Sequence, residues 1–162
     1  MRTITSVTPQ ELVTAWVDDL RSGTYQQTRE VLKRTNQTTG QSGYCCLGVL
    51  CETALRLCPE LAEFRPIWDG PDTHFDGHTG TLPNWLASYI RLDEDGHIIA
   101  RDWYEEEHDE WNWEITPFVY EGEEGTTRTS LIQFNDEFQL PFSAIATLVE
   151  EQLLPRLNGE NT

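Results

Sequence analysis

The chain has few positive charges. Its 162 residues contain 11 Lys and Arg against 28 Asp and Glu, which gives a formal net charge of −17. Proteins that bind DNA, RNA or an anionic membrane directly present Lys and Arg to the phosphates, so the composition argues against these partners. It allows a basic protein partner, or mimicry of nucleic acid in which carboxylates replace phosphates. The alternative is a merely soluble acidic protein, because net charge governs solubility and association but not fold.

Long hydrophobic runs are also lacking. No stretch approaches the roughly 18 apolar residues of a membrane span, and the first five residues are not followed by the apolar run of a signal peptide. We therefore expect a cytoplasmic protein. In that reducing compartment the cysteines are expected to be buried thiols that pack as small hydrophobes. They are Cys45, Cys46, Cys51 and Cys58.

None of the common catalytic or phosphate-binding signatures is present. The patterns Gly-x-Gly-x-x-Gly, Gly-x-x-x-x-Gly-Lys and Gly-x-Ser-x-Gly do not occur. The spacing of Cys46 and Cys51 fits no common zinc knuckle, and their apolar surroundings do not favour an activated thiolate. We therefore assign no catalytic residue, no metal and no cofactor. An enzyme of unknown class is the third interpretation of the function.

Two short segments have both a chemical and a structural interpretation. His74, Asp76 and His78 alternate as metal ligands do, but the Gly and Asp content of this segment also suits an ordinary loop. Asp136 is a possible ligand or base, but Asn135-Asp136 also has the composition of a turn or a helix cap. We favour the structural interpretation of both segments.

The chain is rich in acidic residues mixed with aromatic ones. Residues 93–124 hold thirteen of the 28 Asp and Glu but a single basic residue, Arg101. Solvated acidic tails are poor in aromatics, so we expect a folded acidic surface. The predicted partner-binding residues are its aromatics and the acids of its central loop: Trp103, Tyr104, Glu105, Glu106, Glu107, Asp109, Glu110, Trp111 and Trp113.

Hydrophobic periodicity and end signals predict four helices. Thr8-Pro9-Gln10-Glu11 has the pattern of a capping box with Pro at the first helical position, and Gly23 ends this helix. Residues 44–57 are apolar nearly all round, as a central helix is, and Gly48 within them indicates close approach by another backbone. The other two are a short helix that begins at Pro83 and an amphipathic helix over 142–157.

The strand predictions lie mainly in the acidic segment. Residues 97–104 and 111–120 are predicted strands on either side of an acidic loop, with Pro117 interrupting the second strand and Asp95-Gly96 as a hairpin signal. The rest is less regular: Thr24–Thr35 is predicted as a strand or short helix, 36–43 as an exposed loop, and 64–80 as irregular apart from a short strand around 64–68.

These elements predict one α+β domain over residues 1–157, in which three to four helices pack on a small antiparallel sheet. The acidic, aromatic-rich segment is expected to form an insert at about 93–125, and residues 158–162 a frayed tail.

Three segments occur together in a distinctive order. They are GYCCLGVLC at residues 43–51, LPNWL at 82–86, and residues 131–149 with Asn135-Asp136 and the sequence FSAIA at 142–146. This order resembles a family of small uncharacterised proteins of tailed bacteriophages, which has distant bacterial relatives. Here Trp85 stands one or two places early, and residues 95–127 are longer and more acidic than the family pattern. The resemblance implies a phage or prophage accessory protein inside a host cell, and it implies no activity.

The leading hypothesis is a phage-encoded interaction protein that inhibits or redirects a bacterial host system such as a defence complex. Its partner would be a host protein with a basic surface: carboxylates would steer the encounter, and Trp and Tyr would supply the binding hot spots. The alternative is a module that binds a small nucleotide signal, with Arg29, Lys33 and Arg34 holding phosphate. A solvated face is the simpler interpretation of these three residues.

Overall fold

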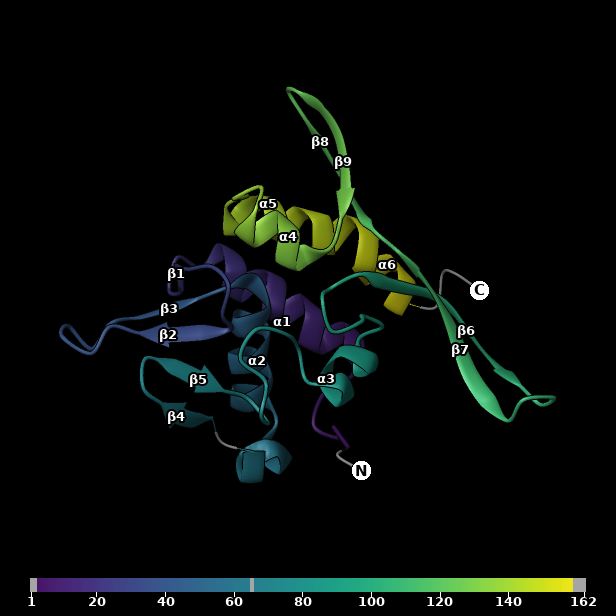
Figure 1. Ribbon diagram of the computed structural model, residues 1–162, viewed down its shortest axis with the longest axis horizontal. Helices are drawn as coiled ribbons and strands as arrows, with labels where there is room; N and C mark the ends of the chain where they lie inside the picture. The colour runs from purple at the N-terminus through teal and green to yellow at the C-terminus, as the bar shows by residue number, and fades with distance from the viewer. Residues whose placement is uncertain (1–2, 65, 159–162) are drawn as a thin grey trace.

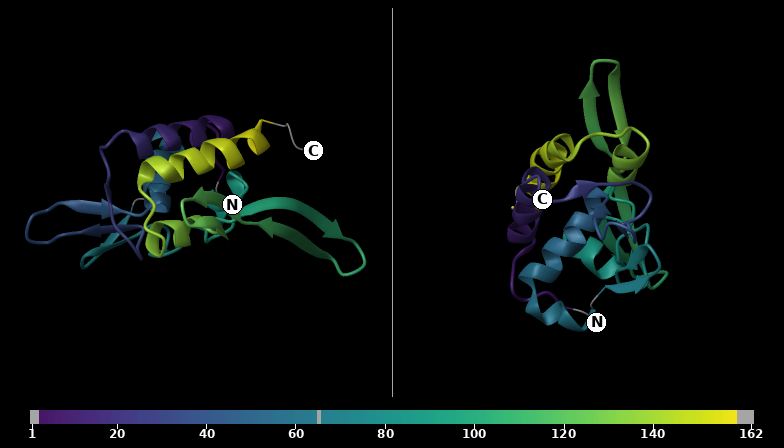
Figure 2. Two further views of the ribbon diagram at one scale, coloured as in Figure 1. Left: turned by 90° about the horizontal axis from the view of Figure 1, so that it is seen from above. Right: turned by 90° about the vertical axis from the view of Figure 1, so that its left-hand side faces the viewer.

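The computed structural model describes residues 3–64 and 66–158. Within those residues, a body of helices and a small sheet carries two projecting hairpins (Figures 1 and 2). The helices are α1 (Pro9–Arg21), α2 (Cys46–Leu57), η1 (Pro59–Phe64), α3 (Asn84–Tyr89), α4 (Leu131–Asp136), α5 (Phe142–Leu148), η2 (Val149–Leu153) and α6 (Leu154–Leu157). The strands are β1 (Gln26–Gln27), β2 (Lys33–Thr35), β3 (Ser42–Tyr44), β4 (Ile67–Asp69), β5 (Asp72–His74), β6 (Ile98–Glu105), β7 (Glu110–Thr116), β8 (Phe118–Gly122) and β9 (Gly125–Thr129). The predicted α+β class is confirmed.

Helix α1 begins as its sequence predicts. The Thr8 hydroxyl accepts a hydrogen bond from the Glu11 amide at 3.1 Å, and the Glu11 carboxylate accepts one from the Thr8 amide at 3.3 Å. Pro9 fits the first helical position because that position needs no amide donor. The buried side of α1 packs against α2, where the indole of the fully buried Trp16 donates to the Cys46 carbonyl at 2.9 Å.

Helix α2 is the predicted central helix and is buried over most of its length. It begins two residues later than expected, because Tyr44 belongs to β3 and Cys45 is the N-cap, whose sulfur accepts from the Gly48 amide at 3.4 Å. The predicted close approach at Gly48 is confirmed. A Cβ atom at this position would lie 1.7 Å from the carbonyl oxygen of Leu32, and the same oxygen accepts from the Cys45 amide at 3.2 Å.

The sequence predicted the main sheet only in part, since β1 and β2 lie within residues 24–35, predicted as a strand or short helix, and β4 overlaps the short strand expected around 64–68. The sheet has the strand order β1-β3-β2-β5-β4, with β1 parallel to β3 and the other pairs antiparallel, so it is mixed and not purely antiparallel. Strands β4 and β5 arise from residues 64–80, which were predicted mostly irregular, and β3 takes up part of the expected loop 36–43. Each of these strands has only two or three residues, too few for alternation to be visible in the sequence.

The two strands predicted in the acidic segment are present, but the second is divided in two. Residues 97–104 correspond to β6, and residues 111–120 form β7 and β8, which belong to different hairpins. Strand β6 pairs with β7, and β8 pairs with β9, with Pro117 between β7 and β8. Proline lacks the amide that would continue a ladder, so the pairing with β6 ends before it and the following strand pairs with β9. The Asp95-Gly96 turn is closed by a single bridge, Leu92 to Ile98, and the main partner of β6 is β7.

The predicted helix over 142–157 is observed as α5, η2 and α6 in succession, with one π-helical segment at η2. Gln152 in that segment hydrogen bonds to both polar backbone groups of Val119, at 2.8 and 2.7 Å, and thereby fixes the start of the β8–β9 hairpin. Residues 159–162 of the predicted frayed tail lie outside the described part of the chain. Within that part, no helix is long and apolar enough to cross a bilayer.

The substitution Gly48→Ala tests the contact between α2 and the backbone of Leu32. Alanine would gain about 1 kcal/mol of helix propensity, but its methyl group would overlap the Leu32 carbonyl oxygen. Because overpacking of a core typically costs about 1–3 kcal/mol and the neighbour is backbone, we expect the free energy of unfolding in urea to fall by about 2 kcal/mol. The control is Thr14→Ala on the exposed side of α1, which should not destabilise the fold. An unchanged urea midpoint for Gly48→Ala would show that the backbone at Leu32 can move away from α2 without a loss of stability.

Candidate functional site

The β6–β7 hairpin is fixed at its base and projects from the body at its tip (Figures 1 and 2). At the base, Asp93 closes the turn: its Oδ1 accepts from the His97 amide at 2.8 Å, and its Oδ2 lies 2.8 Å from the His97 ring Nδ1. The first amide of α4, that of Leu131, donates to the Gly96 carbonyl at 3.1 Å. These contacts set the direction in which the hairpin leaves the body.

The four predicted aromatics lie on two different faces of this hairpin. Across the strands Trp113 is paired with Asp102, Asn112 with Trp103, and Trp111 with Tyr104, and successive side chains of a strand point to opposite faces. The inner face therefore consists of Asp102, Tyr104, Trp111, Trp113 and Ile115, and the outer face of Arg101, Trp103, Glu105, Glu110, Asn112 and Glu114. Ring contacts agree with this division: the Tyr104 and Trp111 centroids are 5.3 Å apart, and the Arg101 guanidinium lies 4.9 Å from the Trp103 ring.

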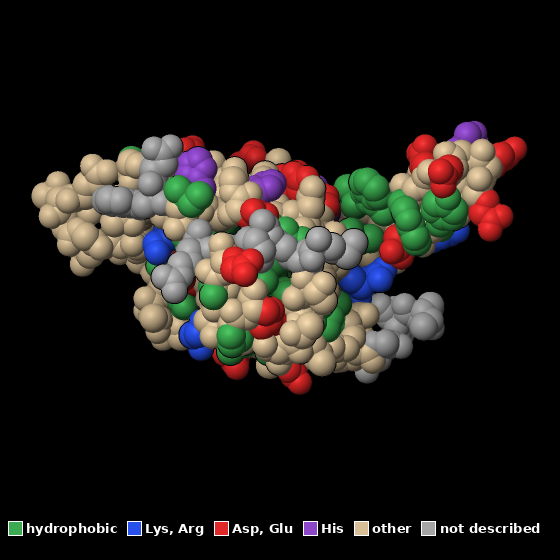
Figure 3. Space-filling model, turned by 90° about the horizontal axis from the view of Figure 1, so that it is seen from below, with side chains coloured by type: hydrophobic (Ala, Val, Ile, Leu, Met, Phe, Trp, Pro, Cys, Tyr) green, Lys and Arg blue, Asp and Glu red, His purple; other side chains and the backbone are tan. Residues whose placement is uncertain are grey.

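The aromatic side chains of the hairpin are unusually exposed. Trp111 is 64% exposed and Trp113 61%, while Tyr104 and Trp103 are 43% and 39% exposed. Figure 3 shows hydrophobic side chains along the projecting hairpin and acidic ones gathered around its tip. A contiguous exposed apolar patch rimmed by polar residues is typical of an interaction surface.

The acids of the tip repel one another. Glu105 and Glu110 are directly opposed across the two strands, an arrangement of like charges that destabilises a hairpin. Among the described residues, local contacts alone offset it: Asn112 donates to Glu105 at 3.4 Å, and the His108 ring lies 3.3 Å from the same carboxylate. The Tyr104 hydroxyl donates to Asp109, and this hydrogen bond raises the pKa of Tyr104. The fold gains nothing evident from this concentration of charge.

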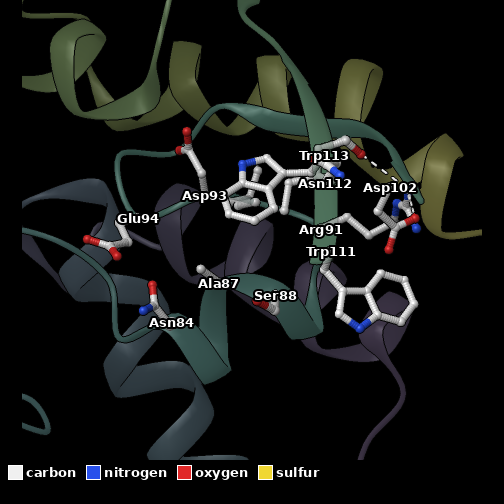
Figure 4. A pocket seen from close by; sticks show the side chains of 12 residues that line it. Asn84, Ala87, Ser88, Arg91, Asp93, Glu94, Asp102, Trp111, Asn112 and Trp113 are labelled. Atoms are coloured by element: carbon white, nitrogen blue, oxygen red, sulfur yellow. Dashed lines mark hydrogen bonds and ion pairs between the residues drawn. The ribbon is translucent and has the colours of Figure 1, made fainter. Parts of the chain in front are cut away.

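A groove of about 490 Å³ lies between the inner face of the hairpin and helix α3. Figure 4 shows the Trp111 and Trp113 rings on the hairpin side and Asn84 and Ser88 on the helix side. The sequence did not predict the α3 side of this groove. Those residues are separated from Trp113 by about a sixth of the chain, and no local pattern indicates that α3 and the hairpin approach each other.

The charges that line the groove are predominantly negative. Asp93, Glu94 and Asp102 contribute three carboxylates against one guanidinium, that of Arg91. Arg91 is already engaged: its Nη2 donates to the Ile99 carbonyl at 3.2 Å and lies 3.9 Å from the Asp102 carboxylate.

The three basic residues of the nucleotide hypothesis do not all meet at one site, because Arg29 and Arg34 share a hollow that Lys33 does not line. Lys33 and Arg34 are neighbours in β2 and so point to opposite sides of the strand. Lys33 forms an ion pair with Glu52 at 3.2 Å, and Arg34 forms one with Asp72 at 2.9 Å. Arg29 and Arg34 line a hollow of about 390 Å³, but its rim also carries a carboxylate, that of Glu30.

The other chemical candidates have structural roles. Asp76 accepts a hydrogen bond from the Trp85 indole at 2.9 Å, and the His78 ring lies 3.2 Å from the Thr81 hydroxyl. Across residues 3–64 and 66–158, no group of three His, Cys, Asp or Glu side chains could hold a metal ion. Asn135 is fully buried within α4, and its side-chain amide donates to the Asp136 carboxylate at 2.8 Å.

All four cysteines are buried and unpaired. Burial raises the pKa of the Cys45 thiol to about 12 and that of Cys58 to about 11, and it raises the pKa of Cys46 and Cys51 well above the ordinary range. A thiol in this state is a poor nucleophile, because the thiolate is the reactive form.

The fold and site define an α+β domain that presents an acidic, aromatic hairpin beside a groove. The model of one protein family, described as a domain of unknown function (DUF8296), matches residues 9–153. The protein belongs to this family, and the matched interval includes the β6–β7 hairpin and both sides of the groove. Searches of curated proteins and of solved structures found no significant match.

Thiol reactivity tests the assignment of the cysteines to the core. Because all four thiols are buried and have raised pKa values, we expect the native protein to resist a water-soluble aromatic disulfide reagent at neutral pH. All four should react at once after denaturation in guanidinium. The measurement is the absorbance of the released thiolate. Rapid modification of one cysteine in the native protein would reveal an accessible, activated thiol and reopen the enzymatic interpretation.

Proposed function

We propose that this protein is a phage-encoded interaction protein that binds a host protein with a basic surface through the β6–β7 hairpin. Binding would inhibit or redirect a host system, and an anti-phage defence complex is the first candidate. The observation that carries the proposal is the combination of exposed indoles with uncompensated acids on one projecting element. Aromatic anchors of this kind are enriched among binding hot spots, and the acids favour a positively charged partner.

The distribution of charge supports a partner whose groove normally holds nucleic acid. The tip carries five carboxylates within six consecutive residues, 105–110, and in this proposal they take the place of phosphates. The hairpin projects from the body (Figure 1), so it can enter a concave basic surface without a clash from the helices. The bacteriophage setting rests on the sequence resemblance described above.

Charge steering predicts a strong dependence of association on salt. Exposed charges are screened beyond about 8–10 Å at physiological ionic strength, so the on-rate for the captured partner should fall at least about tenfold between low and high salt. The off-rate should change much less, because rim charges act mainly on the encounter. Stopped-flow mixing of the purified proteins measures both rates. An on-rate that is equal at low and high salt would rule out steering by the acidic tip.

Charge reversal locates the interaction on the hairpin. Five substitutions to Lys, at Glu105, Glu106, Glu107, Asp109 and Glu110, should leave the circular dichroism spectrum unchanged, because the tip contributes no core residue and would lose its internal repulsion. They should abolish binding to the host protein that the wild type captures from lysate, since like charges would then meet at the interface.

A matched control separates the tip from net charge. Substitution of five exposed carboxylates outside the hairpin with Lys changes the net charge equally: Glu63, Glu123, Glu124, Glu137 and Glu151. This control should retain binding to within about threefold in Kd, apart from a slower on-rate. A folded tip variant with full activity would remove the acidic tip from the mechanism and direct attention to the hollow beside Arg29 and Arg34.

A further inference from the structure

We infer that the groove between α3 and the inner face of the hairpin binds an arginine side chain from an extended basic segment of the partner. The guanidinium would stack on the Trp113 ring and hydrogen bond to the Glu94 carboxylate. This inference rests on the proposed function and deepens it, because it names the group recognised and moves the centre of the interface from the tip to the groove.

The groove has the electrostatic character of a cation site. Three residues with carboxylates and one with a guanidinium line it, and Arg91 is held at one end by the Ile99 carbonyl and Asp102. Figure 4 shows the Trp113 ring between Arg91 on one side and Asp93 and Glu94 on the other. The carboxylates of Asp93 and Glu94 therefore belong to the end of the groove away from Arg91, and the Trp113 side chain between the two ends is 61% exposed.

Glu94 is the carboxylate that is free to bind a ligand. Asp93 is already used by the turn, since its two oxygens contact the amide and the ring of His97. Glu94 is exposed, and its side chain forms no hydrogen bond or ion pair with the described residues. On the opposite wall, the Asn84 side chain adds an amide oxygen within the same groove.

Arginine fits this combination better than lysine. Its guanidinium is planar, stacks on indole faces and offers a fork of donors to a carboxylate, whereas an ammonium is a compact and strongly hydrated charge. The volume of about 490 Å³ exceeds that of one side chain, so the groove can also receive the residues that flank the arginine.

A second copy of this chain is a poor occupant. Each copy has a net charge of −17, and the hairpin tip next to the groove is itself acidic. A symmetric contact through this face would bring two such tips together, and like-charge juxtaposition across an interface costs several kcal/mol. Charge complementarity thus selects a basic partner.

The test uses defined peptides. Acetyl-Gly-Arg-Gly-amide is titrated into the ¹⁵N-labelled full chain at constant ionic strength, and the indole N–H resonances of Trp111 and Trp113 are followed by NMR. The matched probe replaces arginine with citrulline, which keeps the shape but removes the charge. We expect the arginine peptide to shift both resonances and to bind at least about fivefold more tightly than the citrulline peptide, with the lysine peptide between them.

Matched variants assign the interaction to the groove. Glu94→Gln and Trp113→Leu should each weaken binding of the arginine peptide about fivefold, followed at Trp111, because they remove the carboxylate or the aromatic face. Glu107→Gln at the tip and Trp103→Leu on the outer face should change binding less than about twofold. All four side chains are on the surface, so the melting temperature should remain close to that of the wild type.

Three results would overturn the inference: no shift of the groove resonances, equal binding of the citrulline peptide, or equal losses in the groove variants and their controls.

The outcome is separable from that of the proposed function. If the groove variants still capture the host partner while the five-fold tip variant does not, the interaction protein stands and the arginine site falls. If the peptide binds the groove but no salt-dependent partner is captured, the arginine site stands and the proposed function falls.

Discussion

One buried amide, that of Asn135, connects the parts of this fold. Its Oδ1 accepts from the Cys46 amide at 3.2 Å and from the Gln27 side chain at 2.9 Å, and its Nδ2 donates to the Thr28 carbonyl at 2.8 Å. These bonds join the start of α2 and the first strand of the sheet to α4. A buried polar group left without its partner would cost about 1–3 kcal/mol. Because α4 also begins against the Gly96 carbonyl, the same amide indirectly fixes the base of the β6–β7 hairpin.

Carboxylates on the body form ion pairs with arginines, whereas among the described residues those of the hairpin tip do not. On the body, Arg21 pairs with Glu150 at 2.9 Å and Arg56 with Asp19 at 2.6 Å. At the tip, by contrast, the described contacts of the acids involve only uncharged donors and a histidine. Self-repulsion in the tip lowers the stability of the free protein, and a basic partner would relieve it. The arrangement that lowers the stability of the free protein is therefore the one that, in the proposed function, attracts the partner.

Features that depend on a few adjacent residues could be predicted from the sequence, and features that depend on contacts between distant residues could not. The capping box at Thr8 and the close approach at Gly48 were predictable, because each depends on a few adjacent residues. The sheet was predicted only in part, since its strands are two or three residues long and are held by partners far apart in the chain. The acidic aromatic segment was identified as a surface, but the division of its aromatics between two faces needed the cross-strand register. The groove depends on α3 lying beside the hairpin, a tertiary relation without a sequence signal.

The position of the groove suits it to act as the anchor of an interface. A two-stranded hairpin in water is only marginally stable by itself. The hairpin is therefore stabilised mainly by the contacts between its base and the body. The groove lies next to that base, where Asp93 and Leu131 secure the turn, and one of its walls is a helix of the body. The groove is therefore already ordered in the free protein. A partner that first binds there would pay little conformational entropy for ordering the site. Ordering of the tip against basic residues would follow, so we expect the groove to supply the anchor of the interface and the tip to supply the steering of the encounter and a further share of the affinity.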